Sequence, residues 1–90
     1  MAVRRIDEST KFSAAEVDFV RAVGRRVRLL RANAGLSQEK LASLAGVDRN
    51  FVSQLELGYH SPNVIGLRRL AQALGATAEA ILDNDSLIVP

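Results

Sequence analysis

The hydrophobic positions of the first half of the chain recur at helical spacing. Between residues 20 and 34 they are separated by three or four residues, which places them on one face of a helix. The preceding SAAE, at residues 13–16, has the form of a capping box, so a first helix is predicted over residues 14–34. Gly24 lies inside this helix at some cost in helix propensity, which indicates either close packing or a weak first half. The apolar positions are Val20, Val23, Val27, Leu30 and Ala34.

Two short helices are predicted next, joined by a tight connection. Ser37 can cap QEKLASLA at residues 38–45, and Gly46 can end that helix in the left-handed conformation. Asp48 can cap a third helix immediately afterwards. Because the connection runs only from Gly46 to Asp48, the chain must turn a sharp corner between the two helices. This arrangement is typical of a helix-turn-helix.

The rest of the pattern completes an all-α fold of five helices. Beyond a loop that contains Pro62, residues 64–74 and 78–82 are predicted as helices capped by Asn63 and Thr77. No run predicts a paired strand, except that SLIV at 86–89 can add one at a dimer contact. The chain is therefore divided into a flexible N-terminal arm at 1–12, a helical domain at 13–83 and a C-terminal tail at 84–90.

The third predicted helix separates into two faces when its residues are placed at steps of about 100°. Phe51, Val52 and Leu55 share one arc, which is predicted to face the core. The opposite arc lacks the lysines and glutamates of an ordinary solvated helix. It carries side chains that can pair with base edges in the major groove, each pairing contributing about 1–3 kcal/mol of discrimination. The predicted base-reading residues are Arg49, Asn50, Ser53 and Gln54.

Composition and charge narrow the function. The chain has no cysteine and a single His60, which argues against a disulfide, a metal site or a catalytic triad, and no cofactor is expected. It also lacks a signal-peptide pattern and a long apolar segment, so a cytoplasmic, non-enzymatic protein is expected. Residues 19–69 carry nine basic side chains against three acidic ones, which favours a polyanionic partner, although a solvated basic face is the alternative. The basic AVRR at residues 2–5 is interpreted as frayed chain rather than as an arm on DNA.

Residues 28–82 resemble the helix-turn-helix domain of the phage-repressor and Cro (XRE-like) family of bacterial regulators. The motifs GLSQEKLA, AGV, SQLE, a following proline and LRRLAQALG occur in the family's order. The resemblance implies a five-helix lambda-repressor-like domain that binds double-stranded operator DNA as a homodimer. Neither a membrane nor a small-molecule ligand is expected as a partner. Leu57 departs from the family pattern, because a polar residue is usual there.

The resemblance also implies roles for individual residues. It places the outer arc of the third helix on base edges or adjacent phosphates, and it pairs Arg31 with Glu56. The angular position of Glu56, at the border of the core arc, agrees with a need for a partner. The positions expected to contact phosphate are Gln38, Arg28, Tyr59, His60 and Asn63.

Dimer contacts are predicted at the apolar C-terminal end of the chain. The settings that remain open are a phage switch, a restriction-modification controller and an antitoxin, with VDRNFVS favouring the controller. The alternative function is a protein-interaction module with weak DNA binding, which would need more apolar anchors on the outer arc of the third helix. The predicted dimer contacts are Ile81, Leu82, Leu87, Ile88 and Val89.

Overall fold

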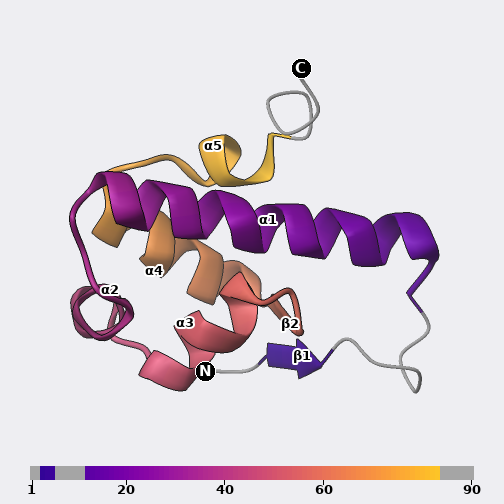
Figure 1. Cartoon of the computed structure of the whole chain (residues 1–90), viewed down its shortest axis with the longest axis horizontal. Helices are drawn as coiled ribbons and strands as arrows, with labels where there is room; N and C mark the ends of the chain where they lie inside the picture. Colours follow the sequence, from indigo (N-terminus) through magenta and orange to yellow (C-terminus); the bar gives the residue numbers. More distant parts are fainter. Residues whose placement is uncertain (1–2, 6–11, 84–90) are drawn as a thin grey trace.

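The described part of the chain comprises residues 3–5 and 12–83 of a computed structural model. In these ranges the chain forms five helices and two three-residue strands (Figure 1), which confirms the predicted helical class. Leu87, Ile88 and Val89, which were predicted to form dimer contacts, lie outside the described residues. The helices are α1 (Ala14–Asn33), α2 (Gln38–Ala45), α3 (Arg49–Glu56), α4 (Val64–Leu74) and α5 (Ala78–Leu82), and the strands are β1 (Val3–Arg5) and β2 (His60–Pro62).

Side-chain caps begin four of the five helices as the sequence predicts. The capping box of α1 is complete, because Ser13 Oγ accepts from Glu16 N at 3.1 Å and Ser13 N donates to Glu16 Oε1 at 2.8 Å. Asp48 occupies the N-cap position of α3, but its side chain makes no capping hydrogen bond. The remaining caps are the side chains of Ser37 on α2, Asn63 on α4 and Thr77 on α5.

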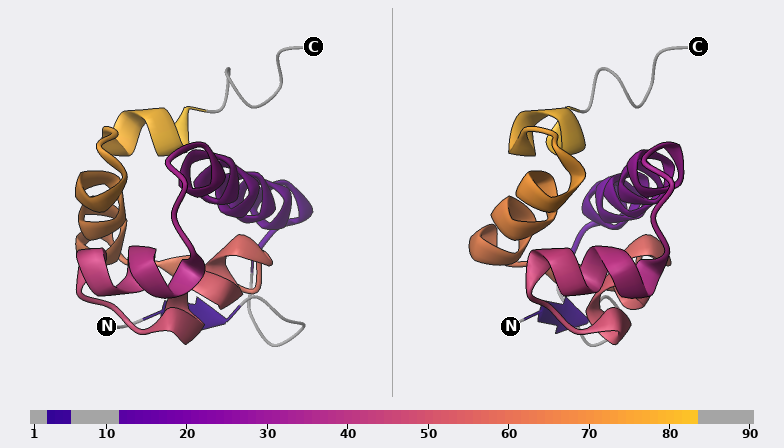
Figure 2. Two further views of the ribbon diagram at one scale, coloured as in Figure 1. Left: turned by 60° about the vertical axis from the view of Figure 1, so that its left-hand side comes forward. Right: turned by 90° about the vertical axis from the view of Figure 1, so that its left-hand side faces the viewer.

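A glycine turns the corner between α2 and α3. Gly46 ends α2 with φ 70° and ψ 36°, and its N–H hydrogen-bonds to carbonyl groups of the last turn. Any residue with a Cβ would be strained in this left-handed conformation. The turn brings α2 and α3 against each other at an angle (Figure 2), as a helix-turn-helix requires.

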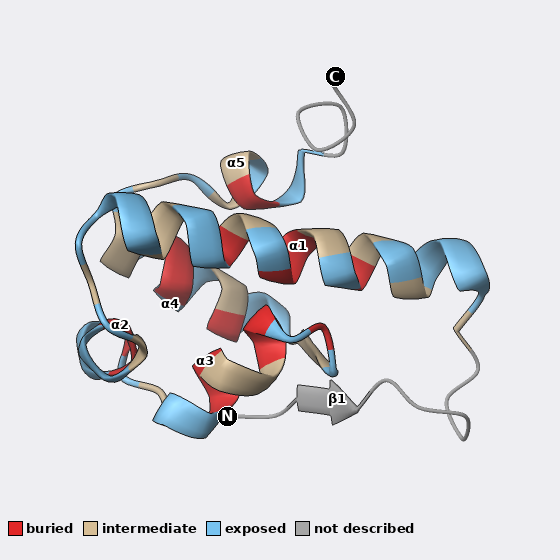
Figure 3. Cartoon of the chain, viewed as in Figure 1, coloured by how far each residue is buried: buried red, intermediate tan, exposed pale blue. Residues whose placement is uncertain are grey.

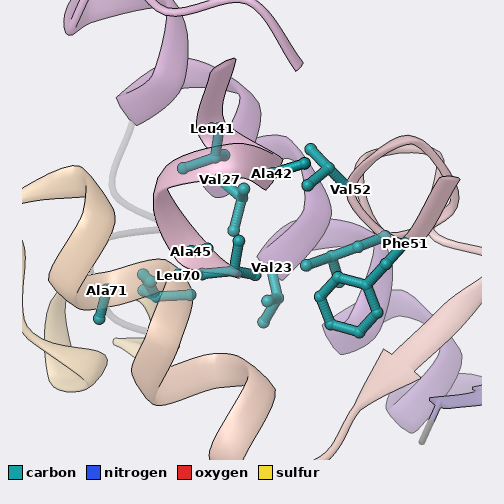
Figure 4. Close-up of a cluster of buried hydrophobic side chains, with 11 residues drawn as sticks. Val23, Val27, Leu41, Ala42, Ala45, Phe51, Val52, Leu70 and Ala71 are labelled. Carbon is teal, nitrogen blue, oxygen red and sulfur yellow. The ribbon is translucent and has the colours of Figure 1, made fainter. Parts of the chain in front are cut away.

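The hydrophobic core draws on all five helices. Its buried residues come from the inner face of α1 (Figure 3) and from the facing sides of α2, α3, α4 and α5. Val27, Leu41, Val52 and Leu70 lie at the centre with no exposed surface (Figure 4). Ile81 of α5 is also 0% exposed, so the prediction that it forms a dimer contact is wrong. Its side chain is buried in the hydrophobic core of its own chain.

Gly24 allows α1 to pass very close to the C-terminal end of α3. A Cβ placed on Gly24 would lie 2.2 Å from the carbonyl oxygen of Leu55 and 3.1 Å from that of Glu56. Both neighbours are backbone atoms, so neither can move aside by a change of rotamer. Of the two interpretations of this glycine, close packing is the one that the structure supports.

The strands β1 and β2 were not predicted. They pair antiparallel, with Val3 opposite Pro62, Arg4 opposite Ser61 and Arg5 opposite His60. The prediction that no strand pairs outside residues 86–89 is therefore wrong, as is the prediction of a frayed chain at Val3–Arg5. Three residues are too few to show an alternating pattern, and the partner strand lies far away along the chain.

Candidate nucleic-acid interface

The two faces of α3 differ in burial as the angular analysis predicted. Phe51, Val52 and Leu55 are buried in the core, while Arg49 and Asn50 are exposed. Ser53 and Gln54, one turn further on, are partly buried. The most accessible polar side chains therefore lie in the first turn of α3, the end that enters the major groove in helix-turn-helix docking.

Arg49 and Asn50 form no side-chain hydrogen bond or ion pair with another described residue. With respect to the described part of the chain, the guanidinium and the carboxamide therefore keep their donors and acceptors available for a ligand. This is the condition that bidentate pairing with a base edge requires.

The ion pair expected between Arg31 of α1 and Glu56 of α3 is present in bidentate form. Arg31 Nε donates to Glu56 Oε2 at 2.6 Å, and Arg31 Nη2 donates to Glu56 Oε1 at 2.9 Å. The hydrogen bond to Glu56 raises the pKa of Arg31, so the guanidinium stays charged beside Glu56, a residue that is only 8% exposed. Arg31 Nη1 also donates to the carbonyl oxygen of Leu36 at 2.8 Å, which fixes the α1–α2 loop.

The structure adds Gln38 to this ion pair, a contact that the sequence analysis missed. Gln38 is the first residue of α2, and its Nε2 donates to Glu56 Oε1 at 3.0 Å. The residue expected to contact phosphate is thus held by the last residue of α3. Sequence spacing could not reveal the contact, because it depends on the angle at which α2 and α3 meet.

The three loop residues expected to contact phosphate differ in how accessible their polar groups are. Tyr59 is exposed, whereas His60 is partly buried and its enclosed Nδ1 has no hydrogen-bond partner among the described residues. Asn63 Oδ1 accepts from Gly66 N at 2.7 Å as the cap of α4. Its oxygen is therefore engaged by the helix, and only its amide N–H groups can be offered to a phosphate.

Two further predicted residues lie away from α3. Arg28 is exposed on the outer side of α1, where it lines an open hollow of about 310 Å³ with Arg25, Leu29 and Ala32. Leu82 is 39% exposed at the end of α5 and remains accessible to a partner.

None of the helices in the described ranges is both long and apolar enough to cross a membrane.

A short helix, a three-residue turn and a second helix with an exposed polar first turn define a helix-turn-helix protein. Residues 22–82 match the family described as a helix-turn-helix domain. The chain belongs to this family of DNA-binding transcriptional regulators. The resemblance to the phage-repressor and Cro group is thereby confirmed.

Two related proteins and one solved structure illustrate the similarity. An uncharacterized HTH-type transcriptional regulator of Sinorhizobium fredii, y4dJ, is 39% identical over 61 residues, covering 68% of this chain and 79% of that protein. The immunity repressor of Bacillus phage phi105 is 32% identical over 66 residues, covering 73% of this chain but only 46% of the repressor. The crystal structure of the restriction-modification controller protein C.AhdI from Aeromonas hydrophila is 39% identical, with a TM-score of 0.67. The match covers 71% of this chain and 96% of the controller.

Proposed function

We propose that the protein is a sequence-specific transcriptional regulator that binds an inverted-repeat operator as a homodimer, with α3 in the major groove. The observation that carries this proposal is the first turn of α3, where Arg49 and Asn50 are exposed and make no side-chain bond to another described residue, on a helix whose other face is core. A surface helix that needed only solubility would not require these base-pairing side chains.

Phosphate contacts would set the register of α3 on the duplex, and its polar arc would select the sequence. The phosphate-contacting group comprises Gln38, Arg28, Tyr59, His60 and the amide N–H groups of Asn63. The base-reading group comprises Arg49, Asn50, Ser53 and Gln54. The excess of basic residues between positions 19 and 69 supports both sets of contacts by attracting the DNA backbone.

A single α3 reads about half a site, which is the reason for proposing a homodimer. Two-fold related copies would place their α3 helices about 34 Å apart, one turn of DNA. Leu82 is the described residue that fits the dimer contact, because it is exposed at the end of α5. We place Leu87, Ile88 and Val89 in the same proposed contact on the strength of their apolar character.

We further infer that the biological setting is control of a restriction-modification system. Support comes from the solved controller C.AhdI, 96% of which is matched by this chain. The test is the genetic neighbourhood, in which a restriction endonuclease gene and a methyltransferase gene are expected beside this one. A neighbouring toxin gene or a set of phage genes would refute the controller assignment.

Binding-site selection from random duplexes, followed by sequencing of the bound pool, tests the proposed function. The expected result is a palindromic motif whose half-sites lie about one DNA turn apart. A pool without any enriched motif at about 150 mM salt would refute sequence-specific regulation. An enriched motif without two-fold symmetry would refute the homodimer alone.

Single substitutions then separate base reading from backbone contact. Arg49→Ala is expected to relax the preference at one base position, whereas Gln38→Ala should weaken binding to all sequences about equally. Arg25→Ala removes a matched exposed arginine on α1 and should leave the selected motif unchanged. Loss of preference in the Gln38 variant and uniform weakening in the Arg49 variant would reverse the assigned roles.

A further inference from the structure

One buried carboxylate joins three helices at the start of α2. Glu56 of α3 accepts hydrogen bonds from Arg31 of α1 at 2.6 and 2.9 Å and from Gln38 of α2 at 3.0 Å. Glu56 is 8% exposed, and Arg31 and Gln38 are partly buried. The ion pair needs only Arg31 and Glu56, so the hydrogen bond from the Gln38 amide must have a different role.

The chemistry of a carboxylate determines which way round the amide of Gln38 lies. An ionised Glu56 can only accept hydrogen bonds, so it faces the NH₂ end of the amide and excludes the flipped orientation. In the flipped orientation Gln38 would turn its carbonyl oxygen toward the carboxylate, and the two acceptors would repel each other. With the NH₂ end held, one N–H is used by Glu56 and the second remains available as a donor.

Arg31 makes this arrangement compatible with an approaching polyanion. An unpaired carboxylate beside the first turn of α2 would repel a phosphate. The bidentate guanidinium neutralises Glu56 while leaving its Oε1 able to accept from Gln38. The second N–H of Gln38 therefore points to solvent in a fixed direction. The charges of Arg31 and Glu56 beside it cancel, so they do not repel a phosphate.

The geometry points to Glu56 as a positioning residue that, neutralised by Arg31, orients the Gln38 amide so that its second N–H donates to a DNA phosphate. This inference rests on the proposed DNA-binding function, and it assigns a role to a residue that touches no DNA itself. Because Glu56 is the last residue of α3, the same contact links the backbone-binding end of α2 directly to the reading helix. The phosphate contact thereby fixes the placement of α3.

The test uses the full chain and the operator duplex recovered by selection, with single phosphates replaced in turn by uncharged methylphosphonates. In the parent protein one replacement near the start of α2 is expected to weaken binding about tenfold, as befits one charge-assisted hydrogen bond. Gln38→Ala should abolish the sensitivity at that phosphate. Glu56→Gln should reduce it strongly while leaving the sensitivity at the other phosphates unchanged.

A second variant of Gln38 distinguishes loss of the amide orientation from a general change in the fold. Gln38→Lys supplies an ammonium group that has donors in every direction and nothing to orient. In that background the sensitivity should return, and adding Glu56→Gln should no longer reduce it. If Glu56→Gln weakens binding at all phosphates alike, or equally in both backgrounds, Glu56 has only a structural role and the inference is overturned.

A measurement on the unmutated protein covers the case in which Glu56→Gln does not fold. Nuclear magnetic resonance of the Gln38 side-chain amide should show one N–H bonded to Glu56 both in the free protein and in the DNA complex. Only the second N–H should change its environment when DNA binds. Loss of the Gln38–Glu56 hydrogen bond in the complex would overturn the inference while leaving the proposed function intact, whereas a parent protein that selects no DNA motif would remove both.

Discussion

Gly24→Ala tests the closest approach in the fold, the passage of α1 over the end of α3. The new Cβ would lie 2.2 Å from the carbonyl oxygen of Leu55, and real Cβ contacts essentially never fall below 3.0 Å. The two helices must therefore separate by about 0.8 Å or more at this point. That separation loosens the buried layer around Val23 and Val27, which lie on the same face of α1.

Two effects of opposite sign decide the size of the change. Alanine is favoured over glycine inside a helix by about 1 kcal/mol, which would stabilise the variant. Overpacking of a close contact typically costs about 1–3 kcal/mol, and a backbone neighbour places Gly24→Ala near the upper end. The expected net loss is about 2 kcal/mol of unfolding free energy, which corresponds to a fall in Tm of about 8–16 °C for a domain of this size.

Urea denaturation followed by circular dichroism measures this loss. Ala32→Gly provides the control, because it makes the reverse exchange at an exposed position of the same helix; since this position lies in the last turn of α1, the loss should be no more than about 1 kcal/mol. A Gly24→Ala variant as stable as the parent, or more stable, would show that helix propensity dominates. It would refute the close approach of α1 to the carbonyl of Leu55.

Three other substitutions examine the ion pair, the cap of α4 and the exposed Leu57 by the same denaturation assay. Arg31→Ala should cost about 3–5 kcal/mol because it leaves the buried Glu56 carboxylate unpaired; a loss below 1 kcal/mol would mean that the carboxylate is solvated. Asn63→Ala removes the hydrogen bond to Gly66 N and should cost about 1 kcal/mol, whereas an unchanged midpoint would mean that the cap contributes nothing. Leu57→Gln alters a side chain that is 54% exposed and should stay within about 0.5 kcal/mol of the parent, so a larger loss would reveal packing that its exposure does not indicate.

The sequence predicted those parts of the fold that depend on local spacing. Apolar periodicity and capping residues placed α2, α4 and α5 with the bounds that the structure shows, and α1 ends one residue before the predicted limit. The same periodicity separated the core face of α3 from its polar face, since one turn of helix fixes both. Leu57 is exposed just beyond the last residue of α3, and nothing in the described part of the chain explains why it is leucine.

What the sequence missed depends on tertiary arrangement. The pairing of β1 with β2 and the hydrogen bond from Gln38 to Glu56 join segments that are distant along the chain. Ile81 was misjudged for a related reason, because a five-residue helix gives too few positions to separate an inner from an outer face. Its burial is decided by how α5 lies on α1 and α4.

The pairing of β1 with β2 also bears on the order in which the molecule assembles. Val3 meets Pro62 only after the intervening chain has been synthesised, so β1 is made well before the strand with which it pairs. Closing so long a loop carries an entropic cost that a strand pair of three residues cannot offset alone. The helical core must bring the loop ends together first, and β1 can then detach or re-pair without unfolding the domain. We therefore expect β1 to open and close without the helical core, next to the loop that follows α3.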